Sequence, residues 1–302
     1  MRELNNYNRT VSVVIPTFKN RGGLVNSIES VLSQNYKGRL EVIVVDDNEP
    51  NSLYRRSTKA LMSTFKNDSR VKYICHESNK NGAAARNTGI RNSSGEYIAF
   101  LDDDDVFLKD KITKQVDYLV THQNMSAVYC HYRKSIKQVY DMTIEGNGTR
   151  DILLLKSNFQ TSTLMFRRES IESINGFDEK FIRHQDYELL LRFFSAGYKI
   201  GCVQEVLVEL GQNRGENIPS GYKLNKIKAL FFEKFNQFIV DEDKRTPGFA
   251  RKVYAKHYAG VFLNHMKHKH FIMAGRVFFS YFLKSPRVFC DVLLRSLKLH
   301  IK

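Results

Sequence analysis

A short apolar run that ends in four consecutive aspartates constrains this chain more than any other feature. Residues 97–101 are nearly all apolar and follow Gly95, a pattern that predicts a buried strand. Residues 102–105 are all Asp, and adjacent carboxylates repel one another at neutral pH unless a cation or hydrogen-bond donors share their charge. A solvated acidic turn before a helix that begins near Leu108 is the alternative. Because open α/β sheets bind ligands at the carboxyl ends of their strands, we favour a functional acidic site.

Strand-like and helix-like segments alternate along the first hundred residues. Four strands are expected, at residues 11–15, 41–45, 71–75 and 97–101. With helical patterns between them, this alternation predicts a parallel sheet with helices on both faces. The ligand site should lie at the strand ends, which carry Pro16, Thr17, Phe18, Asp46, Asp47 and residues 102–105.

The second half of the chain is less regular. Three strands and one helix are expected, at residues 127–132, 161–166, 199–210 and 186–196. The polar, glycine-rich residues 211–221 have the composition of a loop that closes over a ligand. From Tyr222 the pattern is helical to the end. These shifts predict a catalytic domain over residues 1–221 and a helical, basic region over residues 222–302.

Positive charge is concentrated near the C-terminal end. The formal net charge is +15, and residues 244–302 contain thirteen Lys or Arg and a single acid, Asp291. A basic segment rich in aromatic residues favours contact with an anionic membrane surface or with nucleic acid. No stretch reaches the roughly 18 uninterrupted apolar residues of a spanning helix. The polar residues 1–10 predict no signal peptide.

The cysteines fit a reducing compartment. Cys75, Cys130 and Cys202 occur in strand-like runs, where buried, reduced thiols are expected. No Cys-x-x-Cys pair occurs in the sequence. Together with the polar N-terminal residues, this usage predicts a cytoplasmic location.

Five motifs occur in an order that resembles a known enzyme family. They read VVIPTFKN, VVDDN, NG with ARNTGI, FLDDDD, and GFDE followed by QDYEL, at residues 13–20, 44–48, 81–90, 100–105 and 176–189. This series resembles the family 2 glycosyltransferases, inverting enzymes with the GT-A fold that use nucleotide-diphosphate sugars. The resemblance spans residues 11–201. It implies an α/β fold with a Rossmann-like mixed sheet flanked by helices, followed here by a helical C-terminal extension.

The resemblance implies a binding site for the donor base at the ends of the first two strands. Pro16, Thr17 and Phe18 follow the first strand, and Phe18 is expected to stack on the base. A core position for the Phe18 ring is the alternative. Asp46 is expected to hydrogen-bond the base or the ribose, and Asp47 to turn the following loop.

Other donor contacts are implied at the Ala-rich helix and the acidic run, namely Asn81, Arg86, Asp102 and Asp103. Arg86 is expected to contact the diphosphate, with a structural salt bridge as the alternative. The position of Gly89 suggests that the same helix packs closely on the sheet. The D-x-D motif of the family maps onto Asp102 and Asp104. Asp102 is therefore expected at the ribose, and Asp104 at a Mg²⁺ or Mn²⁺ ion that bridges the two phosphates. Asp103 and Asp105 leave the register of the motif open by one residue.

Asp186 matches the catalytic base of the family. An inverting transfer needs a carboxylate that takes the proton of the acceptor hydroxyl while that oxygen attacks the sugar from the opposite face. At a helix start Asp186 could instead be an N-cap, but the preceding GFDE motif favours the catalytic role. The family usually has Glu before this Asp, where this chain has Gln185.

The C-terminal residues 271–302 have the composition of helices that lie in a membrane interface. Ser285 and Pro286 predict a helix start, and an apolar stripe that includes Phe289 and Leu293 follows among cations. A helical pair packed on the catalytic domain, with a solvated basic face, is the alternative. We expect these helices to hold the protein peripherally on the inner face of the cell membrane, and we expect no nucleic-acid partner.

The combined pattern predicts an inverting, metal-dependent, non-processive glycosyltransferase of the hexosyl- or N-acetylhexosaminyltransferase class. The chain has no Trp, so it lacks the Q-x-x-R-W motif of processive members such as cellulose synthases. The expected donor is a nucleotide-diphosphate sugar, in particular a UDP-sugar. The expected acceptor is a lipid-linked saccharide of a surface polysaccharide, such as a capsule, or of another glycan. The alternatives are a nucleotidyltransferase, a basic nucleic-acid-binding protein and a non-catalytic sugar-nucleotide binder.

Overall fold

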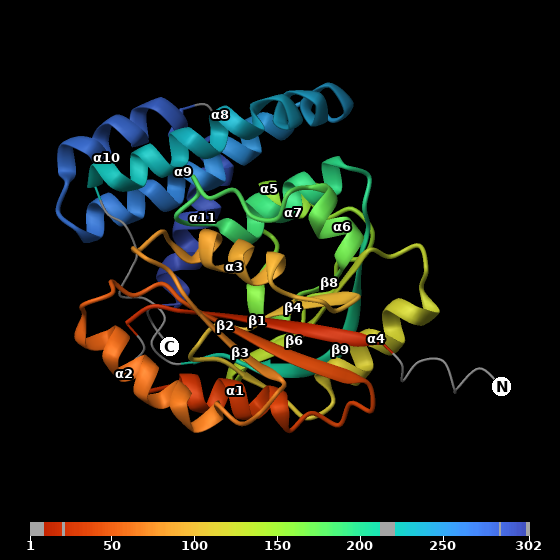
Figure 1. Cartoon of the computed structure of the whole chain (residues 1–302). Helices are drawn as coiled ribbons and strands as arrows, with labels where there is room; N and C mark the ends of the chain where they lie inside the picture. The colour runs from red at the N-terminus through yellow and green to blue at the C-terminus, as the bar shows by residue number, and fades with distance from the viewer. Residues whose placement is uncertain (1–8, 20–21, 212–220, 284, 300–302) are drawn as a thin grey trace. The chain divides into compact units, whose positions relative to one another are not determined.

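The computed structural model (Figure 1) describes residues 9–19, 22–211, 221–283 and 285–299, the last five of them by their backbone alone. The chain forms two compact units, one of residues 1–148 with 158–214 and one of residues 149–157 with 215–302. The predicted loop at 211–221 lies almost wholly outside the described residues. The assignment of catalysis to residues 1–221 and of membrane contact to residues 222–302 stays a prediction.

Four parallel strands form one half of the sheet in the first unit. They lie in the order β3-β2-β1-β4, with β1 at Thr10–Thr17, β2 at Arg39–Asp46, β3 at Val71–Cys75 and β4 at Tyr97–Phe100. Each strand matches one predicted apolar run, and the parallel pairing confirms the interpretation of the alternating pattern. The carboxyl ends of β1, β2 and β4 therefore meet at one edge of the sheet.

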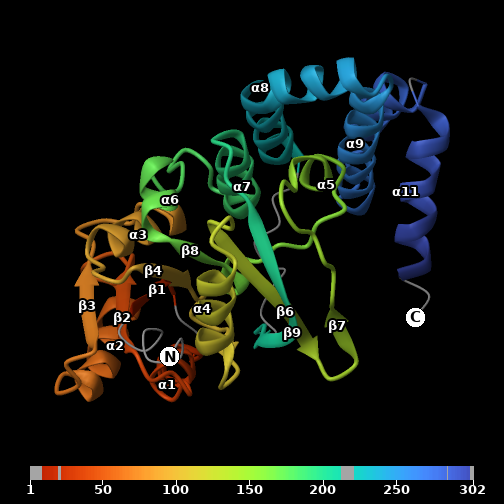
Figure 2. The same cartoon turned by 90° about the vertical axis from the view of Figure 1, so that its right-hand side faces the viewer.

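The other half of the sheet is mixed, as the resemblance implied. β8 (Met165–Arg167) pairs antiparallel with β4 on one side and with β6 (Ala127–Ser135) on the other. β6 runs parallel to β9 (Ile200–Glu209), and Figure 2 shows these two strands side by side. Two short antiparallel strands complete the sheet, β5 (Val106–Phe107) on β9 and β7 (Gln138–Tyr140) on β6. The α/β fold class with a mixed sheet is thus confirmed.

Two details of the predicted strands are wrong. The first half of the predicted strand 161–166 is a 3-10 turn, η3 (Thr161–Thr163), because its hydroxyl groups bond the neighbouring acidic turn and the Gln160 carbonyl instead of extending a ladder. Cys75 is exposed, because β3 is the edge strand of the sheet, whereas Cys130 and Cys202 are buried as predicted.

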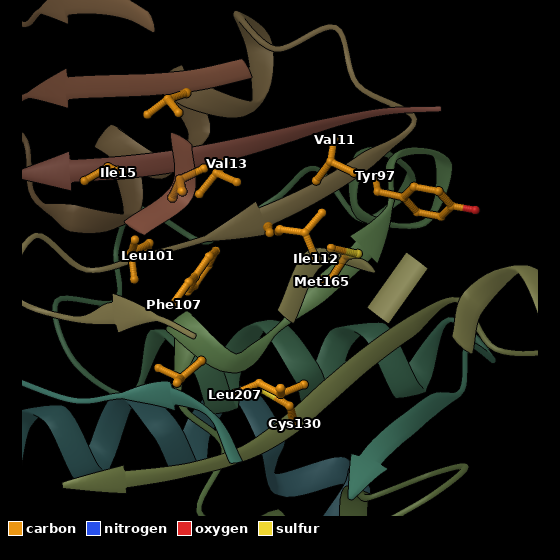
Figure 3. Close-up of a cluster of buried hydrophobic side chains, with 14 of the residues drawn as sticks. Val11, Val13, Ile15, Tyr97, Leu101, Phe107, Ile112, Cys130, Met165 and Leu207 are labelled. Atoms are coloured by element: carbon orange, nitrogen blue, oxygen red, sulfur yellow. The ribbon is translucent and has the colours of Figure 1, made fainter. Parts of the chain in front are cut away.

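Helices cover both faces of the sheet. On one face α1 (Leu24–Leu32), α2 (Leu53–Met62) and α4 (Lys111–Thr121) pack over the core that is drawn in Figure 3, which includes Val11, Val13, Ile15, Ile112 and Met165. On the other face lie α3 (Gly82–Arg91), α6 (Arg168–Ser173) and α7 (Gln185–Ser195); Figure 1 shows α3 across the strands from α1 and α2. Because both faces are covered, the central strands are mostly apolar on both of their sides.

Helix α3 approaches β1 closely at Gly89, as its position in the sequence suggested. A Cβ atom at this residue would lie 2.1 Å from Cγ1 of Val14, which is far inside van der Waals contact. Only a residue without a side chain lets the helix backbone pack this near the strand. The close approach fixes the height of α3, and so of Arg86, above the sheet edge.

Replacing Gly89 by Ala is expected to destabilise the first unit by about 1–3 kcal/mol, the usual cost of overpacking a core. Gly260→Ala provides the matched control, because no atom lies within 4 Å of a Cβ at Gly260 in the middle of a helix. That change should be stabilising by up to about 1 kcal/mol through helix propensity. Thermal melts of the two variants check the prediction, and equal melting temperatures would contradict it.

The second unit is helical. It contains α5 (Thr149–Leu153), α8 (Gly221–Arg245), α9 (Phe249–Lys267), α10 (Phe271–Val277), the π-helix η4 (Phe278–Phe282) and α11 (Pro286–Leu299). Helix α11 begins at Pro286, as predicted. No helix among the described residues has both the length and the apolar character needed to cross a membrane.

The predicted apolar stripe of the last helix is partly wrong. Phe289 is fully buried and contacts the rings of Phe262, Phe278 and Phe282 within the second unit. This ring therefore fills the core of the helical unit. The prediction that Phe289 faces a membrane is therefore wrong.

Candidate active site

The four aspartates after β4 have different environments. Asp105 is fully buried, and its carboxylate oxygens accept hydrogen bonds from the Ser162 hydroxyl (2.5 Å) and the Gly211 backbone N–H (2.9 Å). Asp102, Asp103 and Asp104 are partly exposed at the edge of the sheet. Both carboxylate oxygens of Asp105 are engaged in hydrogen bonds within the protein. This arrangement favours the register in which Asp102 and Asp104 form the D-x-D pair.

Arg86 joins the acidic run to the start of α7. Its Nη2 lies 2.5 Å from Oδ1 of Asp102, and its Nη1 donates to Oε1 of Gln185 at 2.8 Å. The guanidinium also lies 5.5 Å from the centre of the Phe177 ring. The salt bridge that was the alternative for Arg86 is present. It holds a buried cation beside the carboxylate to which the resemblance assigns the ribose.

The loop before α7 is fastened to α3 at the residue after Arg86. The Asn87 side chain donates to the Phe177 carbonyl at 2.9 Å and accepts from its N–H at 2.8 Å. The Phe177 ring packs edge-on against Phe100 of β4, with 5.2 Å between ring centres. These contacts explain why the GFDE motif precedes the helix: it sets the position of α7 against α3 and the sheet.

Asp186 lies in the first turn of α7. The N-cap position belongs to His184, which has a left-handed backbone conformation with φ of 56°, so the N-cap alternative for Asp186 is wrong. Its Oδ1 accepts a hydrogen bond from the Tyr187 backbone N–H at 2.9 Å. Burial raises the pKa of Asp186 to about 6; that hydrogen bond and the charge of Arg86 oppose the rise, and the charge of Asp102 adds to it.

A cavity of about 350 Å³ brings several of these side chains together. Arg86, Asp102, Gln185 and Asp186 all line it. It therefore joins a raised-pKa carboxylate, a buried cation and the end of a central strand, which is the composition of a site for acid–base chemistry.

The end of β1 adds Thr17 and Phe18 to the site. Thr17 Oγ1 donates to Oδ2 of Asp103 at 2.5 Å, and Pro16 and Thr17 lie opposite Val45 and Asp46 in the parallel register. Phe18 is 45% exposed, with the Lys19 ammonium 5.0 Å from its ring centre. This exposure excludes the core alternative for Phe18, while its stacking on a base stays a prediction.

Asp46 is buried, and hydrogen bonds within the protein engage both of its oxygens. Oδ1 accepts from the backbone N–H and the side-chain amide of Asn48, at 2.9 and 2.8 Å. Oδ2 accepts from the Tyr73 hydroxyl at 2.5 Å and pairs with Arg55 at 3.1 Å. Asp46 therefore anchors the loop after β2, and its contact with a base or ribose stays a prediction.

Asp47 and Asn81 shape the loop that precedes α3. The Asp47 carboxylate accepts from the backbone N–H groups of Lys80 and Asn81, both at 2.9 Å, so it holds the loop before α3, whereas the predicted role was in the loop directly after β2. Asn81 caps α3, because its Oδ1 accepts from the N–H groups of Ala83 (2.8 Å) and Ala84 (3.2 Å). Asp46 and Asn81 make no hydrogen bond to the acidic run among the described residues. Their donor contacts stay predictions.

The sequence analysis missed several residues of the site. Ser162 bonds both Asp105 and the backbone N–H of Asp102. Arg183 and His184 line the cavity beside Asp186. Arg183 and His184 directly precede Gln185, and this position was their only signal in the sequence. The left-handed backbone of His184 and the hydrogen bonds from Ser162 to a distant segment cannot be recognised from the sequence.

The carboxylates of the acidic run after β4 are the side chains to which the resemblance assigns a divalent cation. Among the described residues no three His, Cys, Asp or Glu side chains are grouped to hold a metal ion. Mg²⁺ commonly takes only one or two protein carboxylates and completes its shell with water and substrate phosphates. The partly exposed carboxylate of Asp104 fits that kind of site.

Comparison with known proteins places the chain in a family. The model of glycosyl transferase family 2 matches residues 12–193. The amylovoran biosynthesis glycosyltransferase AmsB of Erwinia amylovora is 27% identical over 225 residues, which cover 68% of this chain and 73% of AmsB. WfaP of Escherichia coli, a UDP-Glc:alpha-D-GlcNAc-diphosphoundecaprenol beta-1,3-glucosyltransferase, is 31% identical over 194 residues, 63% of this chain and 72% of WfaP.

Solved structures share the fold. The crystal structure of S. aureus TarS 1–349 in complex with UDP-GlcNAc superposes with a TM-score of 0.62 at 17% identity, over 85% of this chain and 73% of that chain. At this identity the likeness shows a common fold. Since the family model spans well over half of the sequence, including every motif from the first strand to α7, the chain belongs to glycosyl transferase family 2 and is a glycosyltransferase.

Proposed function

We propose that this glycosyltransferase moves one sugar from a nucleotide-diphosphate donor, in particular a UDP-sugar, to a saccharide acceptor with inversion at the anomeric carbon. One observation carries the proposal: Asp186, whose pKa burial raises to about 6, shares a cavity with Arg86 and Asp102 at the sheet edge. A carboxylate with such a pKa is charged at neutral pH and still basic enough to accept a proton.

The proposed reaction is a single displacement. The acceptor oxygen forms a bond to the anomeric carbon while the bond from that carbon to the phosphate oxygen breaks. The proton of the acceptor hydroxyl moves to the Asp186 carboxylate, and the electron pair of the broken bond leaves with the nucleoside diphosphate. Because the attack comes from the face opposite the leaving group, the configuration inverts.

The donor is held by residues at three strand ends in this proposal. Phe18 stacks on the base, Asp102 contacts the ribose, and Arg86 lies beside the diphosphate. Asp104 would hold a Mg²⁺ or Mn²⁺ ion, which when bound supplies positive charge to the departing diphosphate. The UDP-GlcNAc complex of TarS, which shares the fold, supports a nucleotide-diphosphate sugar as the donor class.

The acceptor is proposed to be a lipid-linked saccharide of a surface polysaccharide. WfaP, whose name specifies a saccharide linked to diphosphoundecaprenol, and AmsB, named for amylovoran biosynthesis, support this class. The excess of Lys and Arg over residues 244–302 supports a peripheral position on an anionic membrane. A cytoplasmic, membrane-bound enzyme would meet both a soluble donor and a lipid-linked acceptor.

A donor panel tests the proposal. The full chain is heated with UDP-, GDP- and dTDP-sugars in Mg²⁺, Mn²⁺ or excess chelator, and nucleotide release is followed. We expect one nucleotide class to raise the melting temperature only when metal is present, because a ligand that binds the folded state stabilises it. We also expect slow release of the nucleoside diphosphate. If no nucleotide sugar stabilised the protein, the proposed function would be contradicted. Release of pyrophosphate from nucleotides would also contradict it and would indicate nucleotidyl transfer.

A further inference from the structure

The helical unit contains a cavity that the proposed sugar transfer does not use. It measures about 500 Å³ and is lined by Arg251, Tyr254 and Ala255 of α9 together with Tyr281 and Leu283. Its volume suits a small ligand or a lipid head group. One cation, two tyrosine rings and two aliphatic side chains give it both a polar and an apolar side.

A rare backbone conformation shapes this cavity. Phe278–Phe282 is a π-helix, a conformation that occurs mostly as single turns and often at functional sites. It directs Phe278 and Phe282 toward the buried Phe289, and it places the Tyr281 ring parallel to that of Tyr258, with 3.6 Å between ring centres. In the same turn, Phe279 remains 68% exposed.

Three large apolar side chains are exposed on the helical segment that contributes Tyr281 and Leu283 to the cavity. Ile272, Phe279 and Leu283 are 77%, 68% and 67% exposed, and their spacing of seven and four residues places them on one side of the helical segment. We name these three residues the apolar ridge. Leu283 belongs both to the ridge and to the lining of the cavity. Exposed apolar residues that are grouped in this way mark contact surfaces.

The helical unit also exposes several cations. Arg251, Lys252, Arg276 and Arg287 are exposed, and none of them pairs with a carboxylate of the described residues. Arg251 is the member of this group that lines the cavity. Its planar guanidinium can donate two parallel hydrogen bonds to a phosphate group, which an ammonium cannot do.

We propose that the cavity binds the phosphate of an anionic phospholipid while the apolar ridge enters the acyl region of the bilayer. The inference rests on the membrane-bound part of the proposed function and assigns it to particular residues. A bilayer offers phosphate and hydrocarbon at adjacent depths, which matches a cavity with an arginine that is continuous with exposed aliphatic and aromatic side chains. Nucleic acid would engage the cations but would leave the ridge in water.

Vesicle binding by the full chain tests the proposal. The protein is sedimented with vesicles of phosphatidylcholine alone and of phosphatidylcholine with phosphatidylglycerol, at low and high salt. We expect binding to the anionic vesicles that weakens with salt but persists, because apolar burial is not screened. Phe279→Ser with Leu283→Ser should lower the affinity by at least about tenfold, since each buried side chain contributes strongly. Ile136→Ser, at an isoleucine of the other unit that is 87% exposed, is the control and should have no effect.

Two adjacent cations separate a phosphate site from general attraction. Arg251→Gln should lower affinity for anionic vesicles by about fiftyfold, as it removes both a charge and charge-assisted hydrogen bonds. Lys252→Gln removes the same charge one residue away and should cost about fivefold. Arg251→Lys keeps the charge, and its loss of affinity should lie between those of the other two variants. Melting temperatures verify that each variant is folded.

Several results would overturn the assignment. Equal losses of vesicle affinity for Arg251→Gln and Lys252→Gln would contradict the phosphate site. Unchanged vesicle binding by the ridge variant would contradict insertion of the ridge into the bilayer. Release from vesicles by millimolar glycerol phosphate would show that the cavity takes a soluble phosphate instead. If RNA displaced the protein from vesicles, and bound the ridge variant as tightly as the unaltered protein, nucleic acid would be the ligand instead. Lipid binding needs no sugar transfer, so failure of the transferase assay leaves this test intact.

Discussion

Replacing Asp186 by Asn should lower turnover by at least about 100-fold, the usual loss when a general base is removed. The amide has the same shape and can still accept the Tyr187 N–H bond seen at 2.9 Å, but it cannot take a proton from the acceptor. Affinity for the nucleotide sugar should be nearly unchanged, because the residue acts on the acceptor. Steady-state kinetics and donor binding measured on the same preparation check the prediction.

Asp110→Asn is the matched control for this change. Asp110 is exposed and bonds the Asn35 side chain, and it should tolerate the same exchange without loss of activity. A large loss of donor affinity with little change in turnover for Asp186→Asn would instead make Asp186 a structural residue.

The pH dependence follows from the environment of Asp186. Burial raises its pKa to about 6, so kcat/KM should fall about tenfold per pH unit below that value as the base becomes protonated. Because the pKa of the folded protein lies above the unfolded value, protonation favours folding at low pH, and this contribution is lost as the pH rises through about 6. Asp186→Asn should therefore raise the melting temperature at pH 7.5 more than at pH 4.

Asp104→Asn should lower metal-dependent transfer by about 100-fold or more, since charge neutralisation of the leaving group is lost. The carboxylate is partly exposed, so the fold should remain stable. Asp105→Asn should behave in the opposite way. Its buried oxygens accept bonds from Ser162 and Gly211, and an amide N–H in place of one oxygen would cost about 1–3 kcal/mol of stability.

The adjacent pair makes the outcome specific to position. Melting temperatures and activity at several metal concentrations distinguish a lost metal site from a weakened fold. Normal turnover of Asp104→Asn, or full wild-type activity in excess chelator, would eliminate the role of a metal. If Asp105→Asn lost activity while Asp104→Asn did not, the D-x-D register would have to shift by one residue.

The parallel half of the fold could be predicted because its apolar runs have one physical explanation. Strands buried on both faces need continuous apolar sequence, and residues 11–15 and 97–101 supply it. Gly89 was also interpretable, because only close packing explains a glycine in the middle of a short helix. The strand predicted at 161–166 failed in its first half, because Thr favours strands by propensity, whereas here the Ser162 hydroxyl bonds Asp105 and the Thr163 hydroxyl bonds the Gln160 carbonyl.

The candidate site was predictable in its residues and less so in their environments. The motifs indicated Arg86, Asp102 and Asp186, but no pattern indicates that Arg86 bridges Asp102 and Gln185 across 99 positions of the chain. The burial of Asp105 and Phe289 depends on tertiary neighbours from distant segments. Composition could therefore identify the basic, aromatic tail, but it could not separate its buried rings from its exposed ones.

The anomeric configuration of the product tests the central claim most directly. The enzyme is supplied with a donor whose sugar is α-linked to the diphosphate and with a lipid-linked saccharide acceptor, and the new linkage is assigned by NMR. A single displacement assisted by the Asp186 carboxylate predicts a β-linked product. An α-linked product would contradict the role of Asp186 as the base of an inverting transfer.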